Sequence, residues 1–319
     1  MIPRTFRIVA RAWLCAVLML SMSAHAADEF LPRPQQISAH AYAWIGPYGP
    51  PSRENGGFRM NLGFVVGEDA VAVVDSGYGP EMAESMIRHI RRITEQPIRY
   101  VINTNSQPHR IMGNPAFRKL GAEIIAAEAA VPRILDSGAQ FAGQIARVLD
   151  RSEAEIPLPE RPDHALEERG TFDLGGDIHV EVIPVGDAHT AGSLIVEVRP
   201  DDVVFAGDVL YGGRLLALLP VSDLEGWIAS YDRLRSYTQA TVFVPGHGEP
   251  GHLSSFQEPT YDYLVALRDH MSAAVRDWLG LSEAIQSFDQ SRWKHLANFD
   301  ELAGPNAHQG YLELEAAGM

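Results

Sequence analysis

The segment from Tyr100 to Arg110 constrains the fold and the chemistry of this chain more than any other. An apolar run, Tyr100-Val101-Ile102, leads into a polar loop, and Gly113-Asn114-Pro115 follows where we predict that a helix begins. A short apolar run bounded by turn residues is consistent with a buried strand. The polar loop contains Asn105, Gln107, His109 and Arg110. The sequence therefore places potential ligand side chains between a strand and a helix.

Three later motifs also follow apolar runs. They are Val185-Gly186-Asp187-Ala188-His189-Thr190-Ala191-Gly192-Ser193, Phe205-Ala206-Gly207-Asp208 and Val244-Pro245-Gly246-His247-Gly248. An earlier run ends in the same manner, with Val73-Val74-Asp75-Ser76-Gly77. Loops at strand ends allow a rigid scaffold to bring side chains together that are distant in the sequence. We therefore expect one shared polar site.

The order and spacing of these segments resemble the motifs of the metallo-β-lactamase superfamily, from about Gln36 to the C-terminus. In that superfamily the first loop has the pattern T-H-x-H-x-D-H-x-x-G, and Thr104 and Gly113 match it. The later patterns are G-x-x-H-T-x-G-S, F-x-G-D and P-G-H-G. The resemblance implies an α/β fold, namely a four-layer αββα sandwich of the metallo-β-lactamase type.

The same resemblance implies a metal site. It assigns His189 to the first metal position, His247 to the second and Asp208 to the place between them. His109 stands where the family has an Asp, so we predict it both as a ligand and, with Asp208, as a catalytic residue. Imidazole and carboxylate groups are the usual protein ligands of a catalytic zinc ion. A histidine can also act as a general base near neutral pH.

The first loop departs from the family pattern at all four ligand positions. Asn105 and Gln107 replace histidines, and amide oxygens are weak ligands for zinc. Arg110 replaces another histidine and has no lone pair to offer a metal. We therefore expect no two-zinc site, and instead one zinc ion or another divalent metal. We predict that Arg110 either forms a salt bridge with Asp208 or binds an anionic substrate.

Two functions from different classes follow. The first is a metal-dependent hydrolase with a remodelled, mononuclear site and a small-molecule substrate. The second is a metal-free, non-catalytic binding or accessory protein that retains the cleft and uses Arg110 and the amides. Hydrolysis of β-lactams is a weaker third hypothesis, because it needs efficient hydroxide generation. The sequence does not decide between metal and no metal.

One branch of the superfamily is particularly similar. Gly113-Asn114-Pro115-Ala116-Phe117 and the ending Gly310-Tyr311-Leu312-Glu313-Leu314-Glu315 resemble the exported quinoprotein relay system zinc metallohydrolases. This resemblance implies an exported protein that acts beside periplasmic quinoprotein dehydrogenases.

The first residues have the pattern of a signal peptide. Arg4, Arg7 and Arg11 precede a short apolar run, and Ala24-His25-Ala26 has the small-x-small pattern of a cleavage site. We predict a signal peptide at residues 1–26, cleavage after Ala26, a periplasmic location, and one metallo-β-lactamase-like domain at residues 27–319. Cys15 is the only cysteine, so the mature protein is expected to contain no disulfide, and no membrane segment is expected after cleavage.

The charge excludes some partners. Loss of three arginines with the signal peptide takes the formal net charge from −15 to −18. This excess of acidic residues argues against nucleic acid or an anionic membrane as a partner.

Periodicity predicts the elements around the motifs. We expect helices at 80–93, 114–120, 129–149, 223–237, 260–279 and 281–288, and a proline-rich loop at 157–169. Strands are expected at 37–45, 59–66, 70–74, 98–102, 123–126, 171–174, 178–185, 194–198, 203–205 and 241–244.

Overall fold

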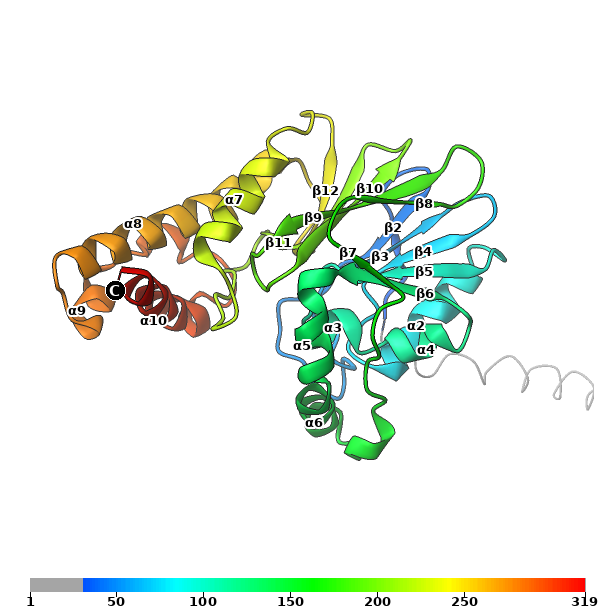
Figure 1. The fold of residues 1–319 in the computed structure, drawn as a ribbon, viewed down its shortest axis with the longest axis horizontal. Helices are drawn as coiled ribbons and strands as arrows, with labels where there is room; N and C mark the ends of the chain where they lie inside the picture. The colour runs from blue at the N-terminus through cyan, green and yellow to red at the C-terminus, as the bar shows by residue number, and fades with distance from the viewer. Residues whose placement is uncertain (1–30, 319) are drawn as a thin grey trace, which may run out of the picture.

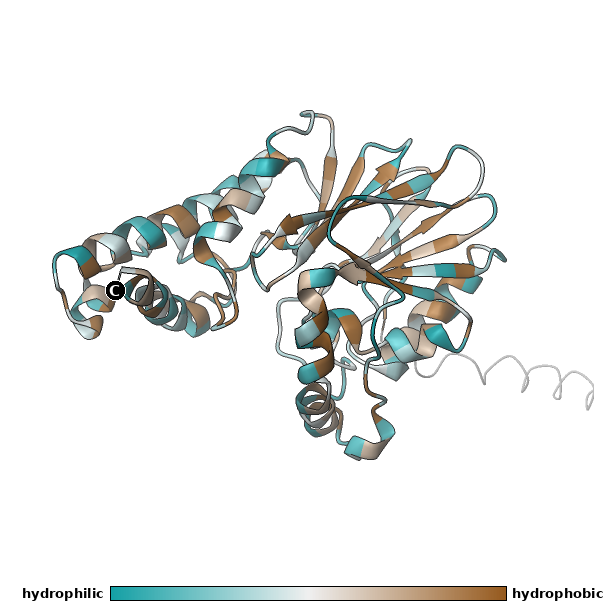
Figure 2. Cartoon of the chain, in the orientation of Figure 1, coloured by the Kyte–Doolittle hydropathy of each residue, from teal (hydrophilic) through white to brown (hydrophobic). Residues whose placement is uncertain are grey.

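The computed structural model describes residues 31–318, so the predicted signal peptide at residues 1–26 lies outside the described part. Two β-sheets pack face to face, and helices cover the outer face of each (Figure 1). This arrangement confirms the predicted α/β sandwich. Hydrophobic residues concentrate along the strands, whereas the outward faces of the helices are largely hydrophilic (Figure 2).

The first sheet has seven strands in sequence order, antiparallel from β1 to β4 and parallel from β4 to β7. The strands are β1 (Gln35–Gln36), β2 (Ala41–Trp44), β3 (Leu62–Val66), β4 (Val71–Val74), β5 (Ile98–Ile102), β6 (Glu123–Ala127) and β7 (His164–Leu166). All four residues of β4 are buried, because one face contacts helices and the other contacts the second sheet. The predicted loop at 157–169 is wrong in part, since β7 lies within it and pairs with β6.

The second sheet has the order β12-β11-β10-β9-β8, and only β11 and β12 are parallel. Its strands are β8 (Gly170–Asp173), β9 (His179–Gly186), β10 (Ser193–Arg199), β11 (Val203–Tyr211) and β12 (Val242–His247). β11 extends well beyond the predicted 203–205. The predicted strand is too short because Gly207 and Asp208 interrupt the apolar run in the sequence. In the structure, β11 pairs with β12 again beyond this interruption, where Tyr211 lies opposite His247.

Helices near the first sheet follow its parallel strands. They are α2 (Pro80–Arg91), α3 (Pro108–Ile111), α4 (Asn114–Arg118), α5 (Val131–Asp136) and α6 (Gly138–Leu149). α2 forms as predicted and buries Met82, Met86 and Ile90. The prediction of a single helix at 129–149 is wrong. The helix is interrupted at Ser137, between α5 and α6 and next to Gly138. Serine and glycine are both weaker helix formers than alanine or leucine.

The C-terminal third adds four helices: α7 (Leu224–Leu234), α8 (Tyr263–Arg276), α9 (Leu281–Ser287) and α10 (Phe299–Gly318). α7 packs on the second sheet, and Asp223 caps its N-terminus by accepting a hydrogen bond from Gly226 N at 2.7 Å. α8, α9 and α10 form an arm that extends away from the sandwich (Figure 1). The pattern did not predict α10, which carries Pro305 in its interior and has little periodicity to detect.

Short helical turns complete the chain, at Glu128–Ala130, Glu153–Glu155, Leu253–Phe256, Gln257–Asp262 and Ser291–Trp293. The helices of residues 31–318 include none that is long and apolar enough to span a membrane. The main core lies between the sheets, where Gly63 allows the ring of Phe205 to approach: a Cβ atom at Gly63 would lie 2.2 Å from that ring. This close contact holds β3 against β11, the strand that carries Asp208.

Candidate functional site

Side chains from four separate segments meet at one end of the sandwich. Asp75 follows β4, Thr104 to Arg110 follow β5, Asp208 lies in β11, and His247 ends β12. Asp75 has a positive φ of 63°, a backbone conformation that few residues other than glycine adopt. Its carboxylate accepts hydrogen bonds from Thr104 N at 2.8 Å and from the Thr104 hydroxyl at 2.9 and 3.0 Å. These bonds connect the first loop to the end of β4.

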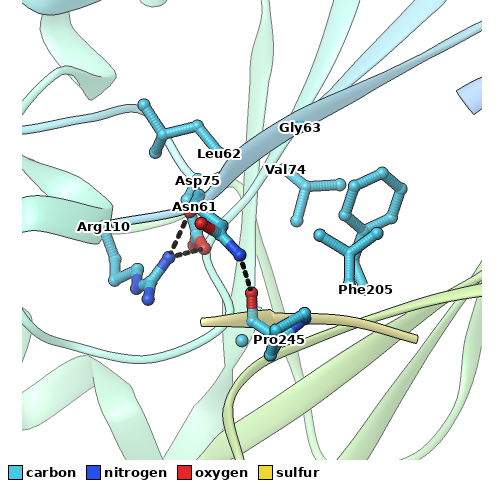
Figure 3. Close-up of a pocket in the computed structure, with 10 residues that line it drawn as sticks. Asn61, Leu62, Gly63, Val74, Asp75, Arg110, Phe205 and Pro245 are labelled. Carbon is cyan, nitrogen blue, oxygen red and sulfur yellow. Dashed lines mark hydrogen bonds and ion pairs between the residues drawn. The ribbon is translucent and has the colours of Figure 1, made fainter. Parts of the chain in front are cut away.

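Arg110 is fully buried and uses every N–H group that it has. Nε donates to Asp208 Oδ2 at 3.1 Å, and Nη2 donates to Asp208 Oδ1 at 2.6 Å and to the Gly246 carbonyl at 3.1 Å. Nη1 donates to Asp75 Oδ2 at 2.9 Å and to the Asn61 carbonyl at 2.7 Å (Figure 3). A guanidinium has five donors, so none remains free. The predicted salt bridge to Asp208 is therefore present, and Arg110 has no donor left for a substrate.

The charges of this network support one another. Burial raises the pKa of Asp75 to about 6, although Arg110 opposes the shift. Burial also acts to raise the pKa of Asp208, but Arg110 outweighs it and holds that pKa well below its usual value. Burial acts to lower the pKa of Arg110, whereas Asp208 and then Asp75 raise it above its usual value. Asp208 is thus an ionised carboxylate held in place by a fixed cation.

Asn105 also contributes to the position of Asp208. Its Nδ2 donates to Asp208 Oδ2 at 2.8 Å, while its own Oδ1 accepts a hydrogen bond from Gln107 N at 2.8 Å. The amide therefore directs its NH₂ group, which cannot bind a metal, at the carboxylate. Asn105, predicted to stand where the resembling loop has a ligand, serves here as a hydrogen-bond donor.

His109, Asp208 and His247 form a compact group of potential metal ligands. One ligand atom from each lies within 4.8 Å of the others. His109 Nε2 is 3.5 Å from Asp208 Oδ2, and His247 Nε2 is 3.5 Å from Asp208 Oδ1. Both distances are too long for good hydrogen bonds. Ligand atoms of a tetrahedral zinc ion are separated by roughly 3.3 Å at normal bond lengths, so the spacing fits one ion.

The protonation of the two histidines also fits a ligand role. Burial lowers the pKa of His109 to about 4, and burial followed by Arg214 lowers that of His247 well below its usual value. Both rings are therefore neutral at pH 7, as metal ligands must be. His247 Nδ1 donates to the Arg59 carbonyl at 2.8 Å, which leaves the lone pair on Nε2, the atom that faces Asp208. His109 Nε2 is buried and lacks a hydrogen-bond partner.

The same arrangement does not fit two metal ions. Arg110 occupies the space between Asp208 and Asp75, and Asn105 presents NH₂ instead of a ligand atom. A second divalent ion would have to approach the guanidinium of Arg110, which five hydrogen bonds hold in place. A buried like charge at such short range is strongly unfavourable.

His189 and Gln107 belong to the site but not to the compact group. His189 lies beside Trp227 and Tyr211, with ring centroids 5.2 and 6.0 Å away. Burial lowers its pKa, and its Nδ1 has no hydrogen-bond partner. Gln107 is 8 % exposed and its Nε2 is also unpartnered. Both residues line a cleft of about 260 Å³ that His109 and His247 share.

Two residues of the site were not predicted as site residues. Asp75 was visible as the end of a D-x-G motif, but its role as a partner of Arg110 depends on the contact between two loops. Arg214 lines the cleft next to His247, with Nη1 3.5 Å from His247 Nδ1. It lies outside every motif, and no sequence signal identifies it.

Comparisons with known proteins concern the family and the fold of the chain. The family model described as metallo-beta-lactamase superfamily matches residues 56–247. A stretch of 92 residues is 30 % identical to the acyl-coenzyme A thioesterase MBLAC2 of Gallus gallus and covers 28 % of this chain. The chain spans 32 % of the length of that relative.

A solved structure supports the fold. The metallo-beta-lactamase from Pontibacter korlensis matches 73 % of this chain and 98 % of its own, with a TM-score of 0.57 and 20 % identity. The family model covers more than half of the chain. The chain belongs to the metallo-β-lactamase superfamily.

Proposed function

We propose that this protein is a hydrolase whose remodelled site holds a single divalent metal ion at His109, Asp208 and His247. The observation that carries the proposal is the placement of these three ligand atoms within 4.8 Å of one another, while Arg110 holds Asp208 from the opposite side. A bound ion of this kind supplies a water of lowered pKa and polarises a substrate carbonyl. Zinc is the proposed ion, because two imidazoles and a carboxylate suit it.

The residues of the chain have separate roles in this proposal. Arg110 and Asn105 fix the carboxylate of Asp208, and the Arg59 carbonyl fixes the ring of His247. His189 lies on the same cleft outside the compact group, is neutral at pH 7 and has a free Nδ1. It is therefore placed to accept or return a proton during hydrolysis.

The comparison with a thioesterase supports one class of substrate to test. The matched relative is named for the hydrolysis of acyl-coenzyme A, so we propose small acyl thioesters and esters as the first substrates to test. The mature protein is proposed to be a single exported domain, residues 27–319, in the periplasm, working beside quinoprotein dehydrogenases. Support for this location comes from the arginines that precede the apolar run of the predicted signal peptide and from the cleavage pattern at Ala26. The segment 113–117 adds support, because it resembles the exported branch.

One observation favours the second candidate, a metal-free binding protein. Arg110 already pairs with both Asp75 and Asp208, so each buried carboxylate has a cationic partner when no metal is bound. This candidate predicts a cleft that binds a ligand without hydrolysis.

Hydrolysis assays separate the two candidates. The mature protein, loaded with zinc, would be assayed on short acyl thioesters and phenyl esters beside His109→Ala and His247→Ala. His295→Ala is the matched control, because that side chain is 63 % exposed and does not line the cleft. We expect zinc-dependent turnover that both site variants abolish and the control retains. Turnover unaffected by either site variant would contradict the proposed site.

A further inference from the structure

The cleft has an unusual charge for a chain of this composition. The formal net charge of the whole chain is −15. No described residue that lines the cleft is acidic, however, and three are arginines: Arg59, Arg133 and Arg214. The field of the whole protein repels anions. A positive cleft in such a protein therefore reflects the local placement of a few side chains.

These arginines lack the partners that arginines normally have. The described residues include no carboxylate that forms an ion pair with Arg59, Arg133 or Arg214. Arg133 packs over the ring of Phe141 at 5.6 Å, and its Nε has no hydrogen-bond partner. Of the three, only Arg214 is buried, and buried arginines are almost always paired, so an unpaired Arg214 beside the cleft indicates a partner that is not part of the chain.

Arg214 is the best placed of the three. It is only 4 % exposed, Nε donates to the Leu215 carbonyl at 3.2 Å, and the guanidinium lies 5.8 Å from the Tyr211 ring centroid. Its backbone is held by Ala297, through Leu215 N to Ala297 O at 2.9 Å and Ala297 N to Gly213 O at 3.1 Å. The segment that precedes α10 thus fixes Arg214 at the cleft, close to His247. The guanidinium of Arg214 keeps N–H donors available for a ligand.

Gln107 supplies an independent observation on the cleft lining. It is nine-tenths buried, lines the cleft and has an unpartnered Nε2 donor. A buried donor without a partner is costly unless a ligand or water satisfies it. The guanidinium groups of Arg133 and Arg214 and the amide NH₂ of Gln107 are hydrogen-bond donors, and such donors are the groups that bind an oxyanion.

We propose that Arg214, with Gln107 and Arg133, binds an oxyanion group of the substrate, a carboxylate or a phosphate, beside the compact group of His109, Asp208 and His247. This inference rests on the proposed function for the identity of the molecule as a substrate, but the binding of the anion does not require the metal. Arg110 has no part in it, because its donors are all used.

Binding would be measured by isothermal titration calorimetry on the mature protein after removal of metal with a chelator. The probes are inorganic phosphate, succinate and the neutral analogue succinamide. We expect phosphate or succinate to bind at least about tenfold more tightly than succinamide, and Arg214→Gln to weaken that binding by about tenfold. Preference for phosphate or for succinate identifies the oxyanion. Arg276→Gln, an exposed arginine on α8 with a side chain 72 % exposed, should leave the affinity within about twofold.

Two further variants keep the test informative if Arg214→Gln folds poorly. Arg133→Gln and Gln107→Ala should each weaken oxyanion binding severalfold. His109→Ala should retain it, although this variant removes a proposed metal ligand. Equal affinity for succinate and succinamide, or oxyanion binding unaffected by Arg214, Arg133 and Gln107, would overturn the inference. Failure of metal binding alone would contradict the proposed function and leave the oxyanion site intact.

Discussion

Arg110 donates two parallel hydrogen bonds to Asp208, 2.6 Å from Nη2 to Oδ1 and 3.1 Å from Nε to Oδ2. Both side chains are buried. A paired contact of this kind is the strongest geometry available to an arginine and a carboxylate. The resemblance to the superfamily predicted Asp208 at a place between two metal positions. In this chain it lies between an internal cation on one side and two neutral imidazoles on the other. The account depends on this relationship.

Loss of Arg110 should destabilise the protein severely. Arg110→Met keeps most of the volume but leaves Asp75 and Asp208 as buried, unpaired carboxylates. Removal of one partner from a buried ion pair costs about 3–5 kcal/mol. Urea unfolding at pH 7 should show a loss of this size. The control is Arg53→Met, whose pair with Asp150 is 68 % and 80 % exposed, and its loss should stay below about 1 kcal/mol. Equal small losses would contradict the role given to Arg110.

Gly246 should be intolerant of any side chain. A Cβ atom there would lie 2.3 Å from Asp208 Oδ1 and 2.7 Å from Arg110 Nη2, so Gly246→Ala must separate the ion pair or move β12. Overpacking of this kind costs about 1–3 kcal/mol. At Gly49 a Cβ atom would meet nothing within 4 Å, so Gly49→Ala should change the free energy of unfolding by less than about 0.5 kcal/mol. Thermal unfolding of both variants tests the difference, and a neutral Gly246→Ala would show that the pair is loosely packed.

Acid stability should depend on Asp201, far from the site. Burial acts to raise the pKa of Asp201, but hydrogen bonds from Ser38 and His40 outweigh it and lower that pKa. A carboxyl group with a lowered folded-state pKa stabilises the protein above its unfolded pKa of about 3.9, and this contribution disappears as the pH falls through the folded value. Unfolding free energies at pH 6 and pH 3 should show Asp201→Asn less stable than the parent at pH 6. The difference in unfolding free energy between the parent and Asp201→Asn should be smaller at pH 3. The same difference at both pH values would contradict a lowered pKa of Asp201.

The strands were predicted because they have strong local signals, whereas the sandwich was predicted from the resemblance to the superfamily. Asp75, Asp208 and His247 each follow or end an apolar run, and a polar residue after such a run marks a strand end wherever it occurs. The salt bridge between Arg110 and Asp208 was also within reach, since a motif placed Asp208 opposite the loop that carries Arg110. The direction of the Asn105 amide was not, because it depends on a hydrogen bond from Gln107 N to Asn105 Oδ1.

The elements that escaped prediction lack local periodicity or depend on tertiary contacts. α10 has Pro305 in its interior and forms because it packs against α8. Arg214 reaches the cleft only because Ala297, more than eighty positions later, holds its backbone. The position of His189 beside Trp227, outside the compact ligand group, likewise depends on how α7 packs on the second sheet.

The most direct test of the account is the metal content of the mature protein from residue 27, purified from periplasm without a chelator or an affinity tag. Mass spectrometry should find close to one equivalent of a divalent metal. The double variant His109→Ala with His247→Ala should lose it, and His295→Ala should retain it. A stoichiometry of two would contradict the position assigned to Arg110. No metal, even after incubation with zinc, iron and manganese, would contradict the mononuclear site and leave the metal-free binding protein as the function of this cleft.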